Sequence, residues 1–372
     1  MPAFALYRLP YQRPCRWVVQ TEGEPEELLS VFGLSENTGF VMAPFAPDKK
    51  HPVLVLHPDQ SGDIMPDRLL EETDGLPRQV AELIDKVLSS PPQKERVTPG
   101  KRKHYAIDFA NFHAHIEAGE FAKVVLARCS REKNDGGLSP LQLFVKACNE
   151  YPRLFVALVS SHRCGTWLMA TPEVLLEGDG KEWCTMSLAG TMKLSQQQLS
   201  FDDPPAKGRH DDREMGWNVK NIQEQRFVST YITESLEQVA TDIEEKGPYT
   251  MRAGDLVHLR SDFTFTMPDK SKVGELLHVL YPTPAVCGLP KEEARDFIIH
   301  NEFAPRLYYS GFAGPLNMDE ETHLFVSLRC MRIDAEGFNL YAGGGLLGDS
   351  EEETEWRETE DKMETMRRLI RD

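Results

Sequence analysis

Residues 154–188 read LFVALVSSHRCGTWLMATPEVLLEGDGKEWCTMSL, and this stretch decides the fold class. It contains four apolar runs, and the last two flank the turn sequence Glu177-Gly178-Asp179-Gly180. No helix fits between these runs, whereas consecutive parallel strands need a crossover of a dozen or more residues. We therefore predict antiparallel strand pairs, and an α+β fold rather than a doubly wound sheet.

Helix and strand patterns continue on both sides of this stretch. Tyr105, Phe109, Phe112 and Ile116 recur at helical spacing, and Ser139-Pro140 is typical of a helix start. Further patterns predict helices at 217–240 and 291–302, strands at 323–334 and 338–343, and a last helix from about 351. Ser350 and Glu353 have the spacing of a capping box at the start of that last helix.

Composition bounds the class of protein. The chain has 372 residues, 40% of them hydrophobic, which is enough for a substantial core. Its formal net charge of -17 argues against a nucleic acid or an anionic membrane as partner. The seven cysteines are widely spaced and include no Cys-x-x-Cys pair, which argues against a disulfide framework and a thiolate zinc site. These observations, and the lack of a signal pattern or a long apolar run, predict a cytoplasmic protein.

A glycine strip near the end of the sequence is the most informative feature for function. Residues 343–348 fit G-x-G-x-x-G, but only 24 residues follow Gly348, too few for the second strand of a dinucleotide-binding unit. A strip without side chains instead lets backbone approach a ligand closely. Glu355, Glu358 and Lys362 follow at spacings of three and four, so they share one helix face. We expect a site for a metal ion and an anionic ligand there.

Glu224 is a second candidate metal ligand. It lies four residues before Val228 and seven before Tyr231, on the apolar face of the helix predicted at 217–240. A buried glutamate is costly unless it is paired or bound to metal. Together with Glu358 it could hold a hard cation such as Mg²⁺. The alternative is that each glutamate forms a salt bridge, for example to Arg226 or Lys362.

Three more polar residues stand in apolar surroundings. Lys123 interrupts an apolar strand, where desolvation would favour a general base, although a lysine facing water at a sheet edge fits the same pattern. Glu173 follows Thr171-Pro172 and is either a general acid or a turn residue. Arg329, in the predicted strand 323–334, would suit a substrate carboxylate if it points inward, and would be solvated if it points outward.

Taken together, these segments resemble the chorismate-utilising enzymes, the anthranilate synthase component I-like family. The resemblance spans about residues 104–368. It rests on these segments: Lys123-Val124-Val125-Leu126-Ala127-Arg128, Thr171-Pro172-Glu173, Leu188-Ala189-Gly190-Thr191, Glu224, Val257-His258-Leu259, Pro282-Thr283-Pro284-Ala285-Val286, Glu302 with Arg306 and Tyr309, Arg329, Ala342-Gly343-Gly344-Gly345 and Glu355-Trp356-Arg357-Glu358-Thr359.

The resemblance implies a fold and a reaction. The expected fold is a single large α+β domain over residues 1–372, in which antiparallel sheets form a sandwich core surrounded by helices. A variable N-terminal region, residues 1–103, would precede the motif-bearing catalytic region, residues 104–368; the polar segment 91–103 reads as a surface loop between them. Family members add a nucleophile to the chorismate ring in a magnesium-dependent reaction, with loss of the 4-hydroxyl group.

The resemblance also implies residue roles. Lys123 matches the base that activates water, Glu173 the acid that protonates the departing hydroxyl, and Glu224 and Glu358 the ligands of Mg²⁺, with Glu355 nearby. Positions expected to contact the substrate are Gly190, Thr191, His258, Ala285, Tyr309, Arg329, Gly343, Gly345 and Lys362.

Within the family, the chain looks most like an isochorismate synthase, with menaquinone biosynthesis as the default pathway. Ala189 stands where aminodeoxychorismate synthases usually have a lysine, and the segment 282–285 looks isochorismate-type. A salicylate synthase or an anthranilate synthase-type enzyme is the alternative, and a non-catalytic chorismate-binding relative is a third hypothesis. We expect a monomer without an amidotransferase subunit. Gln223, Gln225 and Arg226 depart from the usual residues around the metal-binding glutamate, so the surroundings of the metal are expected to differ.

Overall fold

The computed structural model describes residues 1–71, 75–90, 97–193, 217–253 and 256–371. Two nine-stranded sheets form its centre. The first sheet has the order β14 (Gly288–Leu289), β7 (Lys123–Lys133), β18 (Gly337–Leu346), β17 (Cys330–Asp334), β9 (Gly165–Thr171), β8 (Phe155–Ser161), β1 (Ala3–Arg8), β2 (Cys15–Gln20) and β6 (Gln60–Ile64). The second has the order β12 (Thr241–Ala253), β13 (Leu256–Thr266), β11 (Glu182–Lys193), β10 (Val174–Gly178), β16 (Thr322–Val326), β15 (Phe312–Leu316), β4 (Gly39–Ala43), β5 (Val53–Leu56) and β3 (Glu26–Leu28).

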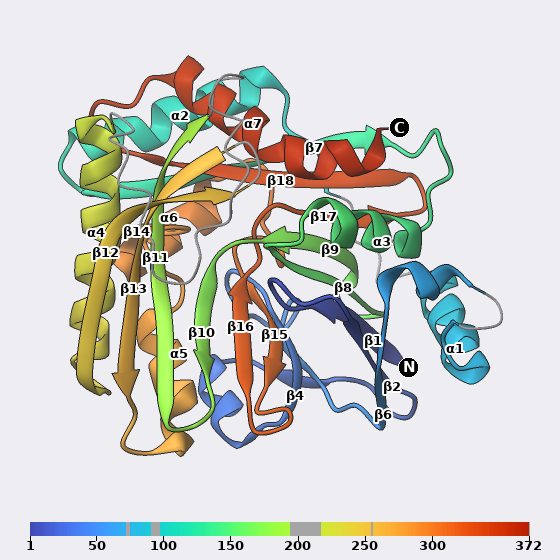
Figure 1. The fold of residues 1–372 in the computed structure, drawn as a ribbon. Helices are drawn as coiled ribbons and strands as arrows, with labels where there is room; N and C mark the ends of the chain where they lie inside the picture. Colours follow the sequence, from blue (N-terminus) through green and yellow to red (C-terminus); the bar gives the residue numbers. More distant parts are fainter. Residues whose placement is uncertain (72–74, 91–96, 194–216, 254–255, 372) are drawn as a thin grey trace.

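Helices cover the outer faces of both sheets (Figure 1). They are α1 (Arg78–Ser89), α2 (Arg102–Glu117), α3 (Pro140–Glu150), α4 (Val219–Leu236), α5 (Val273–Leu280), α6 (Lys291–Asn301) and α7 (Glu352–Ile370), with short 3₁₀ helices η1 (Val31–Glu36), η2 (Pro66–Leu70) and η3 (Lys270–Lys272). The pairings between the described strands are antiparallel. The predicted α+β class and the sandwich surrounded by helices are therefore confirmed.

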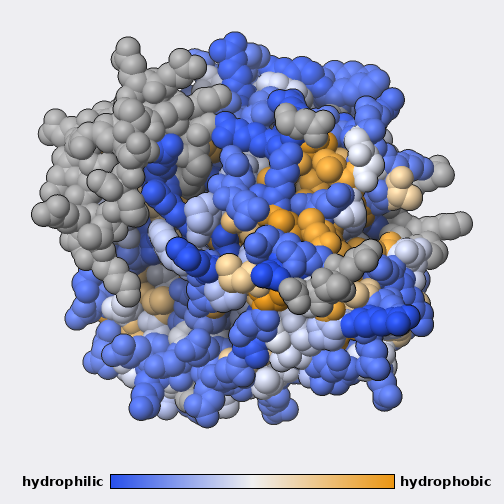
Figure 2. All heavy atoms as spheres, turned by 45° about the vertical axis from the view of Figure 1, so that its right-hand side comes forward, coloured by the Kyte–Doolittle hydropathy of each residue, from blue (hydrophilic) through white to orange (hydrophobic). Residues whose placement is uncertain are grey.

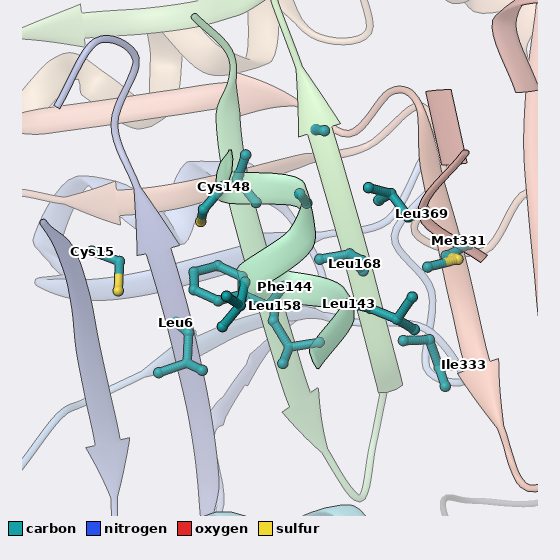
Figure 3. Packing of buried hydrophobic residues seen from close by; sticks show 14 of the residues in the cluster. Leu6, Cys15, Leu143, Phe144, Cys148, Leu158, Leu168, Met331, Ile333 and Leu369 are labelled. Carbon is teal, nitrogen blue, oxygen red and sulfur yellow. The ribbon is translucent and has the colours of Figure 1, made fainter. Parts of the chain in front are cut away.

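Side chains alternate between two buried layers along the strands. In β1, Ala5 and Tyr7 pack between the two sheets, whereas Phe4 and Leu6 point to the opposite face and pack under the helices. Figure 3 shows that second layer, where Phe144 of α3 lies against strand residues such as Leu158. Because β1 and β8, near the middle of the first sheet, are buried on both faces, they read as nearly continuous apolar runs.

The N-terminal residues belong to the same body as the rest of the chain. Strands β1, β2 and β6 extend the first sheet, and β3, β4 and β5 extend the second. Residues 91–96 of the predicted loop at 91–103 lie outside the described residues, and the loop is followed by α2. A division at 103 is therefore not a boundary between two folding units, because both sheets contain strands from each side of it.

The opening stretch, 154–188, forms two hairpins in two different sheets. Strands β8 and β9 pair in the first sheet, and β10 and β11 pair in the second. The chain therefore passes from one sheet to the other between Thr171 and Val174. It passes back between β16 and β17, at residues 327–329. Two backbone hydrogen bonds join the crossings: Val326 N donates to Glu173 O at 2.9 Å, and Ala170 N donates to Arg329 O at 3.1 Å.

The second crossing corrects one prediction. The segment 323–334 is not one strand, because it divides into β16 and β17 in different sheets. Arg329 lies in the break, with a φ of 44° that non-glycine residues rarely adopt. The apolar pattern continues through the break because both halves are buried, so periodicity alone cannot reveal it.

The molecular surface in Figure 2 is mainly hydrophilic, with an apolar area near the centre of the face shown. None of the helices in the described ranges combines the length and the apolar character needed to cross a membrane.

Candidate functional site

A pocket with about 640 Å³ of empty space, some of it open to solvent, brings the two crossings together with the glycine strip. Its walls are Val125, Pro172, Glu173, Leu188, Ala189, Gly190, Thr191, Glu224, His258, Ala285, Val286, Tyr309, Leu328, Arg329, Tyr341, Ala342, Gly343, Gly345 and Lys362.

Glu173 occupies the first crossing and is 2% exposed. Its carboxyl group makes no ion pair or hydrogen bond within the stretches of chain that the structure describes. Burial raises its pKa to about 8, although the positive charges of Lys123, Lys362 and Arg329 act in the opposite direction. The side chain is therefore protonated at neutral pH, which is the state a general acid needs.

Arg329, at the second crossing, contacts His258 of β13. Its Nη2 lies 2.5 Å from His258 Nε2, and His258 Nδ1 lies 3.1 Å from Gly190 O. A guanidinium can only donate, so Nε2 accepts and Nδ1 carries the proton that it donates to the carbonyl. Burial, together with the charges of Arg329 and Lys362, lowers the pKa of His258 well below its usual value, so the ring is neutral. The histidine thus links the arginine to the backbone bulge at Gly190.

Lys123 is fully buried at the start of β7, and its Nζ lies 3.0 Å from Glu224 Oε1. The strand is not at the edge of its sheet there, because β14 pairs with it, so the alternative of an exposed edge lysine is wrong. Burial alone would raise the pKa of Glu224, but Lys123, Lys362 and Lys220 together lower it, and the carboxylate stays charged. The pair meets the glycine strip at Gly345, where an added Cβ would lie 2.3 Å from Glu224 Oε1.

The two glutamates of α7 are paired with lysines as well. Glu358 Oε1 lies 2.7 Å from Lys362 Nζ, which also donates to Gly343 O at 2.9 Å. Glu355, with 1% of its side chain exposed, pairs with Lys220 of α4. Desolvation and the charge of Glu358 raise the pKa of Glu355 to about 7, although Lys220 acts in the opposite direction.

The donor set around Gly344 fits a hard cation. Glu355 Oε2 is buried and has no hydrogen-bond partner within the described ranges, and it would lie 3.1 Å from a Cβ at Gly344, with Glu358 Oε1 at 3.7 Å from the same point. Carboxylate oxygens bordering a strip without side chains are ligands that Mg²⁺ accepts. As the side chains stand, no three His, Cys, Asp or Glu side chains in the described ranges converge closely enough to form a complete metal site. The three lysines hold the carboxylates instead.

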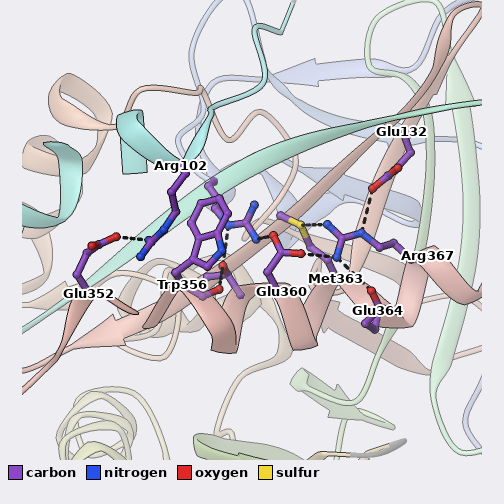
Figure 4. A network of polar contacts seen from close by, with 10 residues as sticks. Arg102, Glu132, Glu352, Trp356, Glu360, Met363, Glu364 and Arg367 are labelled. Carbon is purple, nitrogen blue, oxygen red and sulfur yellow. Dashed lines mark hydrogen bonds and ion pairs between the residues drawn. The ribbon is translucent and has the colours of Figure 1, made fainter. Parts of the chain in front are cut away.

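A polar network anchors α7 to β7 (Figure 4). Arg128 stacks on Trp356 at 3.7 Å from the ring centroid and donates from Nε to Thr359 Oγ1 at 2.6 Å. Further along the helix, Arg367 reaches Glu132 at 3.0 Å. These contacts hold α7 against β7 and so fix the position of the helix face that carries Glu355, Glu358 and Lys362.

The predicted capping box at the start of α7 is wrong. The N-cap is Glu351, which makes no side-chain cap, and Ser350 Oγ accepts from Leu347 N at 3.0 Å. Glu353 pairs with Arg102 and Arg357 instead of turning back to the backbone. The spacing was right for a capping box, but arginines nearby compete for the carboxylate.

The structure brings most of the predicted site residues together. All nine predicted substrate contacts line the pocket, as do Glu173 and Glu224: Gly190, Thr191, His258, Ala285, Tyr309, Arg329, Gly343, Gly345 and Lys362. Lys123, Glu355 and Glu358 are not among the lining residues. Lys123 and Glu358 pair with the lining residues Glu224 and Lys362, whereas Glu355 pairs with Lys220 and borders the glycine strip at Gly344. Binding of a substrate by these residues stays a prediction.

Sequence reasoning missed Lys220 of α4, and it named Gln225 only as a departure from the usual residues, without its supporting contacts. Lys220, the partner of Glu355, is four residues before Glu224, a spacing that puts both on one helix face. Gln225 is buried, accepts from Ala189 N at 3.0 Å and donates to Ser187 Oγ at 2.6 Å, so it supports the strand that leads into Gly190. Gln223 and Arg226 are exposed.

Comparison with known proteins identifies related sequences and folds. A family model described as chorismate binding enzyme matches residues 49–371. Isochorismate synthase DhbC of Bacillus subtilis is 28% identical over 265 residues, covering 69% of this chain and 65% of that protein. Isochorismate synthase MenF of Escherichia coli K12 is 29% identical over 255 residues, covering 68% of this chain and 57% of that protein. The matches thus span less than two thirds of the length of either relative.

Solved structures share the fold over nearly the whole chain. The structure of MenF, the menaquinone-specific isochorismate synthase from Escherichia coli, has a TM-score of 0.74 at 22% identity, covering all of this chain and 89% of that one. Anthranilate synthase component I from Streptococcus pneumoniae has a TM-score of 0.67 at 15% identity, with coverages of 98% and 90%. At such identities the likeness concerns the fold alone.

Proposed function

Because this chain belongs to the family of chorismate binding enzymes, we propose that it is an isochorismate synthase. The reaction is the isomerisation of chorismate to isochorismate, in which water adds at C2 and the C4 hydroxyl departs. The observation that carries the proposal is Glu173: a buried carboxyl group, in its acid form at neutral pH, in the same pocket as the basic residues Arg329 and Lys362. The relatives named isochorismate synthase support the same assignment.

The two proton transfers are assigned to Lys123 and Glu173. Lys123 accepts a proton from the water that attacks C2, and Glu173 gives its proton to the hydroxyl that leaves C4 as water. One water is consumed and one released, and a proton must return from Lys123 to Glu173 before the next turnover. In the ion pair with Glu224, Lys123 is an ammonium without a lone pair, so it must release a proton to solvent and separate from Glu224 before it can act as the base.

Arg329 and Lys362 are assigned to the carboxylates of the substrate, which is a dicarboxylic acid. The guanidinium suits bidentate binding, and the neutral ring of His258 orients it without adding charge. Tyr309, Ala285, Gly190 and Thr191 complete the walls. Gly343 and Gly345 leave room for the ligand beside β18.

Mg²⁺ is the cofactor we propose, held by Glu224 and Glu358, with Glu355 as a third ligand or as the holder of a bound water. When bound, the ion neutralises the negative charge of a substrate carboxylate and of the carboxylates around it. The orphaned Oε2 of Glu355 supports the inclusion of that residue. Glu224, Glu355 and Glu358 would then bind the ion in place of Lys123, Lys220 and Lys362.

The cellular setting belongs to the same proposal. We assign catalysis to residues 104–368, which supply the pocket, and a scaffold role to the variable N-terminal region, residues 1–103. We propose a cytoplasmic monomer that needs no amidotransferase subunit, with menaquinone biosynthesis as its pathway.

The test is incubation of the purified protein with chorismate and Mg²⁺, followed by chromatography of the products. Isochorismate without pyruvate is the expected result. Salicylate with release of pyruvate would assign the chain to the salicylate synthases, and anthranilate formed with ammonium would assign it to the anthranilate synthases. Binding of chorismate without turnover would identify a non-catalytic relative.

A further inference from the structure

Strand β7 has a gap along one edge, immediately after the proposed catalytic base. Its other edge pairs with β18 from Val124 to Lys133. On the gap side, β14 pairs only with Lys123 and Val124, and Val125 N donates to Cys287 O at 2.6 Å. Beyond that point the ladder ends, although Val125 and Ala127 are buried and their backbone groups need partners.

A buried ion pair fills this gap. Glu302 accepts from Ala127 N at 2.7 Å, and Arg306 Nη2 donates to Val125 O at 2.8 Å. The two side chains bind each other, with Arg306 Nε 2.7 Å from Glu302 Oε2, and both are 3% exposed. The pair thus offers a donor to Val125 O and an acceptor to Ala127 N, as the backbone of a neighbouring strand would.

The same pair holds two other walls of the pocket. Arg306 Nη1 donates to Val286 O at 2.6 Å, and Arg306 O accepts from Tyr309 N at 2.9 Å. Val286 and Tyr309 line the pocket, as does Val125. The guanidinium therefore joins the strand of Lys123 to the segment of Val286, and the backbone of Arg306 holds the turn that leads to Tyr309.

We infer that Glu302 and Arg306 are positioning residues for the proposed reaction: the pair stands in for a missing strand and sets the strand of Lys123 against the segment of Val286. The inference rests on the proposed function. Neither side chain lines the pocket. Their effect on catalysis must therefore come through the backbone of β7, where small displacements of a reacting group cost about 10²-fold in rate.

The test compares conservative variants of this pair with a matched pair on the same strand. R306K keeps the charge but cannot reach Glu302, Val125 and Val286 together, and E302Q keeps an acceptor for Ala127 N without the charge. The control is R131K, because Arg131 of β7 also makes a two-bond pair, with Asp334 at 2.6 Å for each bond, but lies outside the pocket. For each variant, kcat and KM for chorismate and the exchange rates of backbone amides are measured.

We expect R306K to lower kcat by at least about tenfold while KM changes by less than about threefold, because the base is displaced more than the binding groups. Exchange of the Ala127 amide should accelerate in R306K and E302Q and stay unchanged in R131K. Folded R306K and E302Q proteins with wild-type kcat would overturn the inference, as would a loss of kcat that R131K shares. An inactive wild-type protein would defeat the proposed function, whereas active variants beside an active wild type defeat the positioning role alone.

Discussion

Two groups of glutamates lie at the pocket, and their surroundings differ in one respect. Glu224, Glu358 and Glu355 each have a lysine beside the carboxylate, and they border the glycine strip. Glu173, on the crossing between the sheets, is as deeply buried as Glu355 but has no such partner in the described ranges. Burial therefore raises the pKa of Glu173 to about 8, although the charges of Lys123, Lys362 and Arg329, which make no ion pair with it in the described part of the chain, act in the opposite direction.

The difference separates two kinds of chemistry. A carboxylate that already balances a cation can exchange that lysine for a metal ion, because the charge it needs is similar. A carboxyl group kept neutral has a proton to give. The position of each group follows from the fold, since α7 and α4 carry the paired glutamates and the crossing after β9 carries the lone one.

The largest expected effect comes from replacing Lys123, which pairs with Glu224 and whose charge also acts on Glu173. Lys123→Met should lower kcat by about 10⁴-fold, the upper end for a general base, because it also leaves Glu224 without its partner. Steady-state formation of isochorismate measures it, with circular dichroism as the control for folding. A folded variant with wild-type kcat would mean that Lys123 is only a counter-ion.

Removing the lone carboxyl group should have the next largest effect. Glu173→Gln keeps the shape and a neutral side chain but has no acidic proton, so kcat should fall by about 10³-fold. Thermal stability should change little, since an uncharged group replaces an uncharged group in the same buried place. Loss of folding together with loss of activity would make Glu173 structural and erase the contrast.

The pH dependence tests the same contrast without mutation. Because the pKa of Glu173 is raised to about 8, its acid form is complete well below pH 8 and is lost as the pH rises through that value. We expect kcat/KM to fall about tenfold per pH unit above 8. The alkaline decline should be missing from the residual activity of Glu173→Gln. A wild-type profile that stays flat from pH 7 to 10 would contradict the assignment.

The contrast also shows which features of the site sequence reasoning can reach. Short connections predicted the antiparallel hairpins of residues 154–188, and lone polar residues in apolar runs pointed to Lys123 and Glu173. The crossings cannot be predicted from sequence, because an apolar run does not say to which of two buried sheets a strand belongs. Arg329 was therefore placed in a strand, although it lies in a break with a φ of 44°.

Counter-ions were the other feature that could not be predicted. Lys220 and Glu355 are 135 residues apart in sequence and meet only because α4 and α7 both approach the glycine strip. In sequence, Lys220 is the single lysine of the segment 219–236, and no pattern there points to Glu355 as its partner. The Glu302–Arg306 pair is local in sequence, but the strand edge that it completes belongs to residues far upstream.

A smaller effect is expected from the lysine beside Glu355. Lys220→Met leaves a carboxylate with 1% exposure unpaired, so the Tm of the metal-free protein should fall by about 3 °C, since a broken buried pair costs roughly 3–5 kcal/mol and Lys220 is only partly buried. Mg²⁺ should restore more of the Tm in this variant than in the wild type. Lys220→Arg, which keeps the charge, is the control. Equal Tm values with and without Mg²⁺ in both proteins would argue against a metal at Glu355.

The smallest effect is expected from two exposed residues near Glu224 in sequence. Gln223 and Arg226 are exposed and do not line the pocket, whereas Gln225 is buried and binds Ala189 and Ser187. Gln223→Ala and Arg226→Ala should change kcat/KM less than about twofold, since exposed substitutions rarely exceed about 0.5 kcal/mol. Gln225→Ala should cost more, because it frees the backbone N–H next to Gly190. A tenfold loss of kcat/KM in Gln223→Ala would show that the paired glutamates depend on exposed residues of α4 as well as on their lysine partners.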